Sequence, residues 1–259
     1  MLLRPRNSGL PAPITLQFLA VALILVLAPK SAVRCESYFA RQQPSPDEIL
    51  SATAENGSRL LSALRGYSYY ADLTIETVGN ADVITGKYYR LSQISFDSAG
   101  VMHERVIENT STLPKDEQFG TSAADSLIRV YQFFLTRETP REYEFNYIGR
   151  ERVDELNTFV FDVNPRVKLP DPEKSRDRYL KGRVWIDDQD FCVVKVAGQA
   201  VPSQSAHRTP KFQTYYQNHE RYWFPALIDA DDAIRIGKYV TRVVVKLRFT
   251  GYKKVGTQR

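Results

Sequence analysis

Residues 182–198 read GRVWIDDQDFCVVKVAG, which is two apolar runs separated by a short acidic segment. Both runs contain valine and the first also contains Ile186, β-branched residues that are enriched in strands, and the segment between the runs has the composition of a turn. The stretch therefore predicts a β-hairpin. Trp185 alternates with Val184 and Ile186 along the first strand. A shift of register by one residue exchanges the two faces, so the sequence leaves open which of them points inward.

Short segments in which apolar and polar residues alternate, separated by turn residues, extend over most of the chain. It predicts further strands over residues 67–78, 83–95, 101–108, 142–151, 158–164, 212–218, 221–230 and 238–249. Consecutive hairpins of this kind build one antiparallel sheet of about nine to eleven strands, and a sheet of that length curls as its twist accumulates.

Two helices are expected beside the strands. Ser45 and Glu48 have the spacing of a capping box, and Pro46 stands at the first helical position, so a helix is predicted over 45–65. Apolar residues at helical spacing predict a second helix over 122–135. The expected fold is α+β: a single strongly curved antiparallel sheet, or half-open β-barrel, with two or more helices covering its concave side.

The N-terminal residues 1–37 are predicted to be a signal peptide or an N-terminal anchor. Arg4 and Arg6 precede an apolar run from Ile14 to Leu27, which is shorter than the ~20 residues of a membrane-spanning helix. Residues 38–259 are then expected to form one half-barrel domain. Such a segment predicts export, with the domain either released or anchored.

The charge of the predicted domain argues against nucleic acid as a partner. Four of the 35 basic residues and one of the 30 acidic residues lie in residues 1–37, so the remainder has a net charge of +2. A nucleic-acid-binding domain carries a strong basic field on its folded part. The nearly balanced charge therefore excludes that class of function.

No catalytic or metal-binding motif is apparent. The three histidines are far apart, and the sequence contains neither a G-x-S-x-G nucleophile elbow nor a phosphate-binding loop. We therefore expect no enzyme activity, no metal and no cofactor. Of the two cysteines, Cys192 lies within a strand and is expected to be a small buried apolar side chain; a disulfide with Cys35 is the alternative.

The helix over 45–65 followed by the Tyr-rich strand 67–78, together with residues 182–187 (GRVWID) and the VVKV segment after them, resembles the LolA/LolB-like periplasmic lipoprotein-carrier superfamily. The likeness follows the order of the elements over most of residues 45–252. It implies a periplasmic protein, released or anchored, whose open curved sheet holds an acyl chain or a hydrophobic peptide in its apolar concavity. The same group includes envelope-stress regulators, which implies an alternative role as a protein-interaction or stress-sensor module without lipid cargo.

Cavities of such sheets are lined by alternate strand residues, many of them aromatic. The predicted ligand-binding residues are Leu73, Ile75, Phe161, Trp185, Tyr222, Phe224 and Val245. The alternative is that these side chains form an ordinary core against the helices. The expected partners are a lipid or lipoprotein acyl chain, an envelope protein, and an anionic membrane surface contacted by Arg242, Lys246 and Arg248.

Overall fold

The computed structural model describes residues 43–113, 131–175, 177–203, 209–236 and 239–255. The chain divides into two units, Met1–Gln42 and Gln43–Arg259, and every described residue belongs to the second. The predicted signal or anchor and its boundary with the domain lie outside the described residues. Within the described ranges, no helix has both the length and the apolar character needed to cross a membrane.

In the described ranges, ten strands form one antiparallel sheet, in agreement with the predicted sheet of about nine to eleven strands. They are β1 (Tyr67–Val78), β2 (Ile84–Phe96), β3 (Met102–Ser111), β4 (Tyr143–Val153), β5 (Leu156–Pro165), β6 (Tyr179–Asp187), β7 (Val193–Val201), β8 (Phe212–His219), β9 (Tyr222–Ile236) and β10 (Tyr239–Lys254). A short 3₁₀ helix, η1 (Asn80–Asp82), lies in the turn between β1 and β2.

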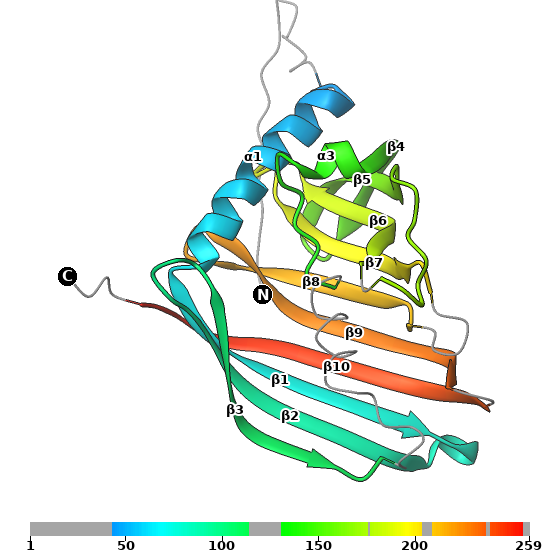
Figure 1. Ribbon diagram of the computed structural model, residues 1–259. Helices are drawn as coiled ribbons and strands as arrows, with labels where there is room; N and C mark the ends of the chain where they lie inside the picture. Colours follow the sequence, from blue (N-terminus) through cyan, green and yellow to red (C-terminus); the bar gives the residue numbers. More distant parts are fainter. Residues whose placement is uncertain (1–42, 114–130, 176, 204–208, 237–238, 256–259) are drawn as a thin grey trace, which may run out of the picture. The chain divides into compact units, whose positions relative to one another are not determined.

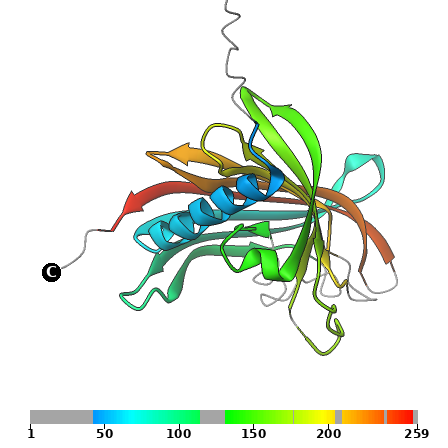
Figure 2. The same cartoon turned by 90° about the horizontal axis from the view of Figure 1, so that it is seen from above.

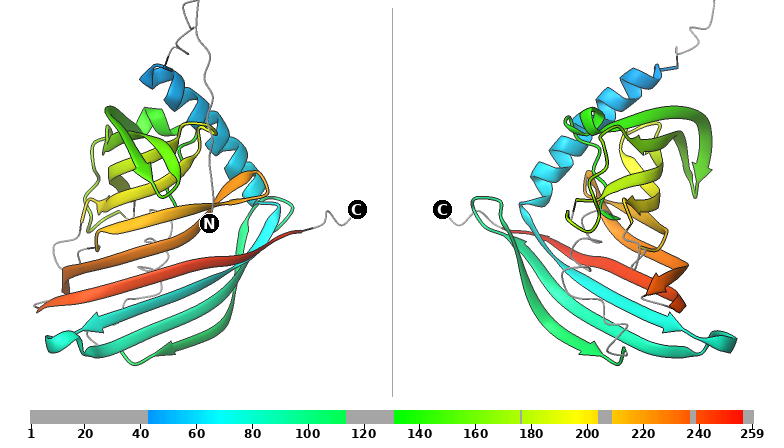
Figure 3. Two further views of the ribbon diagram at one scale, coloured as in Figure 1. Left: turned by 180° about the vertical axis from the view of Figure 1, so that it is seen from behind. Right: turned by 45° about the vertical axis from the view of Figure 1, so that its right-hand side comes forward.

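The order of the strands in the sheet is β3-β2-β1-β10-β9-β8-β7-β6-β5-β4. The last strand therefore lies beside the first, and the pairing of β1 with β10 joins two runs of consecutive hairpins (Figure 1). β3 and β4 are the edges. They do not pair with each other within the described ranges, so the sheet is open. Figure 3 shows its twist from two further directions.

One face of the sheet, called here the inner face, carries the main hydrophobic core. Phe161, Val184, Ile186 and Leu247 are fully buried on it. The same core contains the apolar side of helix α1 (Pro46–Leu64), including Ile49, Leu60 and Leu64, so α1 packs on the inner face. Figure 2 shows α1 lying along the sheet.

The capping box predicted for α1 is confirmed. The hydroxyl of Ser45 accepts a hydrogen bond from the backbone N–H of Glu48 at 3.3 Å, and the Glu48 carboxylate accepts one from the N–H of Ser45 at 2.7 Å. Two backbone N–H groups that the helix leaves without partners are thus satisfied. The hydrogen bonds with Ser45 lower the pKa of Glu48.

The second predicted helix lies mostly on residues outside the described ranges. Residues 132–138, which follow, contain no helix, so the predicted end at Leu135 is wrong. The only other described helix is the short α3 (Thr139–Glu142). Coverage of the sheet by two or more helices therefore stays a prediction, and α1 is the one long helix of the described residues.

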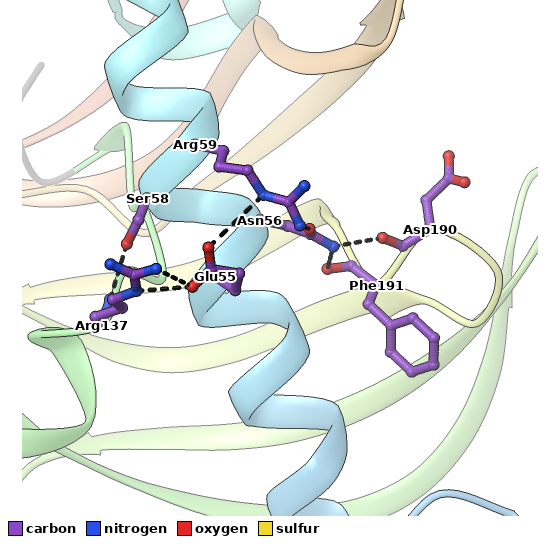
Figure 4. Close-up of polar contacts among 7 residues, drawn as sticks. All are labelled: Glu55, Asn56, Ser58, Arg59, Arg137, Asp190 and Phe191. Atoms are coloured by element: carbon purple, nitrogen blue, oxygen red, sulfur yellow. Dashed lines mark hydrogen bonds and ion pairs between the residues drawn. The ribbon is translucent and has the colours of Figure 1, made fainter.

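Helix α1 is held by close contacts on two sides (Figure 4). A Cβ on Gly57 would lie 1.9 Å from the carbonyl oxygen of Leu135, so the two backbones touch where glycine has no side chain. Beside it, the hydroxyl of Ser58 accepts a hydrogen bond from the N–H of Arg137 at 3.1 Å, and the Glu55 carboxylate accepts one from Nε of Arg137 at 2.7 Å.

On the other side of α1, Asn56 reaches the turn between β6 and β7. Its Nδ2 donates to the carbonyl oxygens of Asp190, at 2.7 Å, and Phe191, at 3.1 Å. These contacts fix the helix between the segment that precedes α3 and the hairpin of residues 182–198.

Candidate ligand-binding site

A cavity of about 170 Å³ lies against the inner face, beside β1, β2, β3 and β10. Most of its wall is apolar or aromatic, and three polar side chains from β2 and β3 form one part of it. The lining residues are Tyr69, Ala71, Leu73, Arg90, Ser92, Ile94, Met102, Glu104, Gln132, Leu247 and Phe249. We call this cavity the pocket.

The apolar wall of the pocket follows from the alternation of β1 and its pairing with β10. Ala71 lies opposite Phe249, and Leu73 lies opposite Leu247. Directly paired residues of antiparallel strands point to the same face, so these four side chains form one continuous apolar surface. Tyr69, which adjoins it, contributes a neutral hydroxyl, and burial raises the pKa of this group further, to about 12.

The polar part of the wall consists of Arg90 and Ser92 from β2 and Glu104 from β3. Nε of Arg90 lies 3.5 Å from Oε1 of Glu104, and the Ser92 hydroxyl donates a hydrogen bond of 2.5 Å to the same oxygen. Arg90 is only 6% exposed. A charge buried this deeply requires a partner, and Glu104 supplies one in the pocket itself.

One side of the pocket adjoins the edge strand β3. Every residue of β3 is exposed, including Met102 at 53% and Val106 at 49%. β2 is the only strand paired with β3 among the described residues. The pocket therefore borders a part of the sheet where apolar side chains and an unpaired strand edge are accessible.

Most of the predicted ligand-binding residues lie on the inner face, but only Leu73 lines the pocket. Five others are buried in the same core or packed against it next to other strands: Ile75, Phe161, Phe224 and Val245 are buried, and Tyr222 is half-buried. These five side chains are therefore packed as ordinary core, which is the alternative that the sequence left open.

Trp185 does not lie on the inner face. Val184 and Ile186 occupy the main core, and Trp185 belongs to a separate small cluster with Val160 and Val194 on the opposite, outer face. Its indole N–H donates to Glu151 at 2.8 Å, and the ammonium of Lys195 lies 4.9 Å from its ring centroid. Its inclusion among the ligand-binding residues is not supported, because the register of β6 turns the ring away from the pocket.

Sequence reasoning missed the polar part of the wall. Arg90 and Ser92 alternate with Leu91 in β2, but the strand also carries apolar residues on its other face, so its sequence does not mark either face as inner. Glu104 lies on a strand whose residues are all exposed. The only available signal was a pair of polar residues at alternate positions, which in isolation favours a solvent-facing side.

The outer face of β10 carries Arg242, Lys246 and Arg248, as predicted, but acidic residues accompany them. Arg242 forms ion pairs with Asp231 at 2.7 Å and Asp82 at 2.6 Å. Lys246 is paired in register with Asp229, and Arg248 with Asp72. This face therefore carries charges of both signs and is not a uniformly basic surface.

The structure also describes Cys192 and the side chains that could bind a metal ion. Cys192 is a free thiol, and burial raises its pKa to about 11. Cys35, its partner in the predicted alternative of a disulfide, lies outside the described residues, so that alternative stays a prediction. No group of three or more metal-ligating side chains occurs within the part of the chain that the structure describes.

Comparisons with known proteins return structural similarity and no sequence relative. No family model matches the chain, and no curated protein matches it. A LolA superfamily protein from Nitrosomonas europaea is similar at 13% identity and a TM-score of 0.37, over 81% of this chain and 93% of that one. A putative outer membrane lipoprotein-sorting protein domain from Vibrio parahaemolyticus is similar at 12% identity and a TM-score of 0.35, over 78% and 92%.

A DUF1329 family protein from Desulfovibrio piger is also similar, at 9% identity and a TM-score of 0.40, over 82% of this chain and 95% of that one. The resemblance to LolA-type proteins expected from the sequence thus reappears among solved structures. At identities of 9–13%, this likeness concerns the fold alone.

Proposed function

We propose that this chain is a non-enzymatic periplasmic protein that binds an acyl chain of a lipid or lipoprotein in the pocket, with a role in the sorting of outer-membrane lipoproteins. The observation that carries the proposal is the pocket itself: an apolar cavity with few polar groups, beside an accessible strand edge. This composition is typical of sites that bind apolar ligands and orient them by a few polar contacts.

The size of the pocket limits how much of a chain it holds. About 170 Å³ is below the roughly 300–1,000 Å³ of most small-molecule sites, so a long chain would extend beyond it along β3. Each buried methylene contributes about 0.8 kcal/mol, which is about fourfold in Kd. Affinity should therefore rise with chain length and then level off once the pocket and its border are filled.

The test uses purified full-length protein and a series of 1-acylglycerols of increasing chain length, with Kd measured by calorimetry. Ala71→Leu adds bulk to the pocket wall and should weaken binding of the decanoyl compound at least tenfold, since its chain loses about two methylenes of buried surface. Thr74→Leu adds bulk to the same strand on the opposite face and is the matched control. Unchanged binding by a folded Ala71→Leu variant would contradict the proposal.

A second function is favoured by a different observation. β3 presents a ten-residue edge with an unpaired backbone among the described residues and with Met102, Val106 and Ile107 exposed. Such an edge can accept an extended strand from another protein. The alternative is thus an envelope protein-interaction or stress-sensor module with no lipid cargo.

The mass of the natively purified protein separates the two functions: co-purifying lipid supports the carrier, and a clean apo mass supports the module. A third expected partner, an anionic membrane surface at Arg242, Lys246 and Arg248, has less support. The acidic residues paired with those side chains offset the attraction.

A further inference from the structure

Four segments of the chain meet at one end of the sheet (Figure 1). The N–H of Val255, just after β10, donates a hydrogen bond of 2.8 Å to the carbonyl oxygen of Gly66, just after α1. A Cβ on Gly100, in the turn between β2 and β3, would lie 3.1 Å from Cδ of Arg65. The turn between β8 and β9 joins them through Glu220, which accepts a hydrogen bond of 3.0 Å from the hydroxyl of the first residue of β1. The end of α1, the two turns and the end of β10 therefore form one surface.

Basic residues predominate on this surface. Four of its cations are exposed, and none of them forms an ion pair with another described residue. We call these four residues the basic end: Arg65, Arg221, Lys253 and Lys254. The segments 65–66, 97–101, 220–221 and 253–255 contain two acidic residues, so their net charge is +2.

The two carboxylates of this surface are engaged within the protein. Asp97 accepts hydrogen bonds from the backbone N–H groups of Ala99 and Val101, both at 2.9 Å, and Glu220 accepts the one from Tyr67. The outer face of β10 differs, because its cations lie beside acidic residues. At the basic end the cations are available to an anion outside the protein.

Exposed apolar side chains stand among these cations. Val101 is 55% exposed, Met102 is 53% exposed and Val255 is 49% exposed. Where Lys and Arg occur with exposed apolar residues, the cations can reach the lipid head groups while the apolar side chains enter the boundary with the acyl chains. Attraction to an acidic protein would account for the cations alone, whereas an anionic membrane accounts for both.

The direction of the side chains favours contact through the end of the sheet. Lys253 and Lys254 are consecutive residues of β10, so they point to opposite faces. Their charges therefore surround the end of the strand instead of marking one face. Met102 also lines the pocket, so contact at this end would bring one wall of the pocket close to the lipid.

We propose that the basic end docks on an anionic membrane surface, with Val101 and Val255 entering its interface. Each Lys or Arg close to an anionic membrane strengthens binding about fivefold. The proposal goes beyond the proposed function, since docking requires no acyl chain in the pocket.

An environment-sensitive fluorophore attached to Val255→Cys in the full-length Cys35→Ser protein would report the docking. Leu169→Cys, in the loop between β5 and β6 and 40% exposed, is the matched position elsewhere. With vesicles of phosphatidylglycerol and phosphatidylcholine, we expect a blue shift for the label at residue 255 and none for the label at residue 169. Vesicles of phosphatidylcholine alone should give neither. The pair of labels reports which end faces the lipid, also where residues 1–37 attach the protein to the vesicle.

Neutralising two of the cations tests their role. Lys253→Gln with Lys254→Gln should weaken docking about 25-fold, so most of the blue shift at residue 255 should be lost. Lys168→Gln with Lys174→Gln makes the same change of charge at two exposed lysines of the β5–β6 loop. This control should keep the shift.

The absence of a shift at residue 255 with the anionic vesicles would overturn the proposal. Equal shifts at residues 255 and 169, or an unchanged shift in a folded variant without the two lysines, would also overturn it. A shift produced by poly-L-glutamate and not by vesicles would assign the basic end to an acidic polypeptide instead. Failure of 1-acylglycerols to bind bears on the proposed function alone. The two labels test the docking even where the lysine variant does not fold.

Discussion

Replacing Gly57 with alanine tests how α1 is seated on the sheet. In a helix without neighbours, this substitution stabilises, because alanine has a higher helix propensity than glycine by about 1 kcal/mol. At Gly57 the new Cβ would lie 1.9 Å from the carbonyl oxygen of Leu135 and 2.9 Å from its carbonyl carbon. Both are backbone atoms, so no side-chain rotation can relieve the contact.

The required displacement can be read from the structure. An ordinary van der Waals contact begins at 3.4 Å, so the helix and the Leu135 backbone would have to separate by about 1.5 Å. A shift of that size would also stretch the hydrogen bonds from Arg137 to Ser58 and Glu55 on the same side of the helix, now 3.1 and 2.7 Å long. Overpacking costs about 1–3 kcal/mol, and each hydrogen bond contributes about 1 kcal/mol. After the gain in propensity, we expect a net loss of about 1–3 kcal/mol.

Urea denaturation followed by circular dichroism would measure the free energy of unfolding of the Gly57→Ala variant. Ser62→Ala is the matched control on the same helix, because Ser62 is exposed and alanine there should stabilise by about 0.5 kcal/mol. A Gly57→Ala variant that is more stable than the wild type by about 1 kcal/mol would refute the close packing of α1 against Leu135.

Three further outcomes are expected. Trp185→Phe removes the indole donor to Glu151 and should lower the free energy of unfolding by about 1–2 kcal/mol. The affinity for 1-decanoylglycerol should not change, since the ring lies on the outer face. Weaker binding would contradict that placement. Burial raises the pKa of Asp187 above 3.8, so the stability that this group contributes is complete below that pH and is lost as the pH rises. The stability of Asp187→Asn relative to the wild type should therefore increase from about pH 3 to about pH 7, with Asp177→Asn as the exposed control; a difference that is flat or falls with pH would be inconsistent with this. Burial raises the pKa of Cys192 to about 11 from 9.0. In a Cys35→Ser variant, this thiol should therefore react with a disulfide reagent about a hundredfold more slowly in the native protein than in urea. Equal rates would show an accessible thiol.

Local signals in the sequence were enough to predict the elements. Ser45 and Glu48 specify the start of α1 through contacts within four residues, and alternation specifies the strands because each residue of a strand changes face. Local signals did not predict which side chains of residues 184–186 point to the main core. Val184, Trp185 and Ile186 are all large and apolar, and both faces of this hairpin are buried, one in the main core and the other in the small outer cluster. A pattern of polarity cannot orient a strand whose two faces are both apolar.

The pocket depends on pairings between distant parts of the chain. Leu73 meets Leu247 because the last strand lies beside the first, and Glu104 meets Arg90 and Ser92 through the register of β2 with β3, which shifts at a bulge between Leu91 and Ser92. Val245 lies on the same face of β10, two residues from Leu247, yet it does not line the pocket. Since neighbouring residues of identical pattern differ in this way, the residues that line the pocket are defined by which strands are adjacent and in what register. The polar side chains of β2 and β3 acquire a chemical role only once that arrangement brings their opposite charges together within an apolar wall.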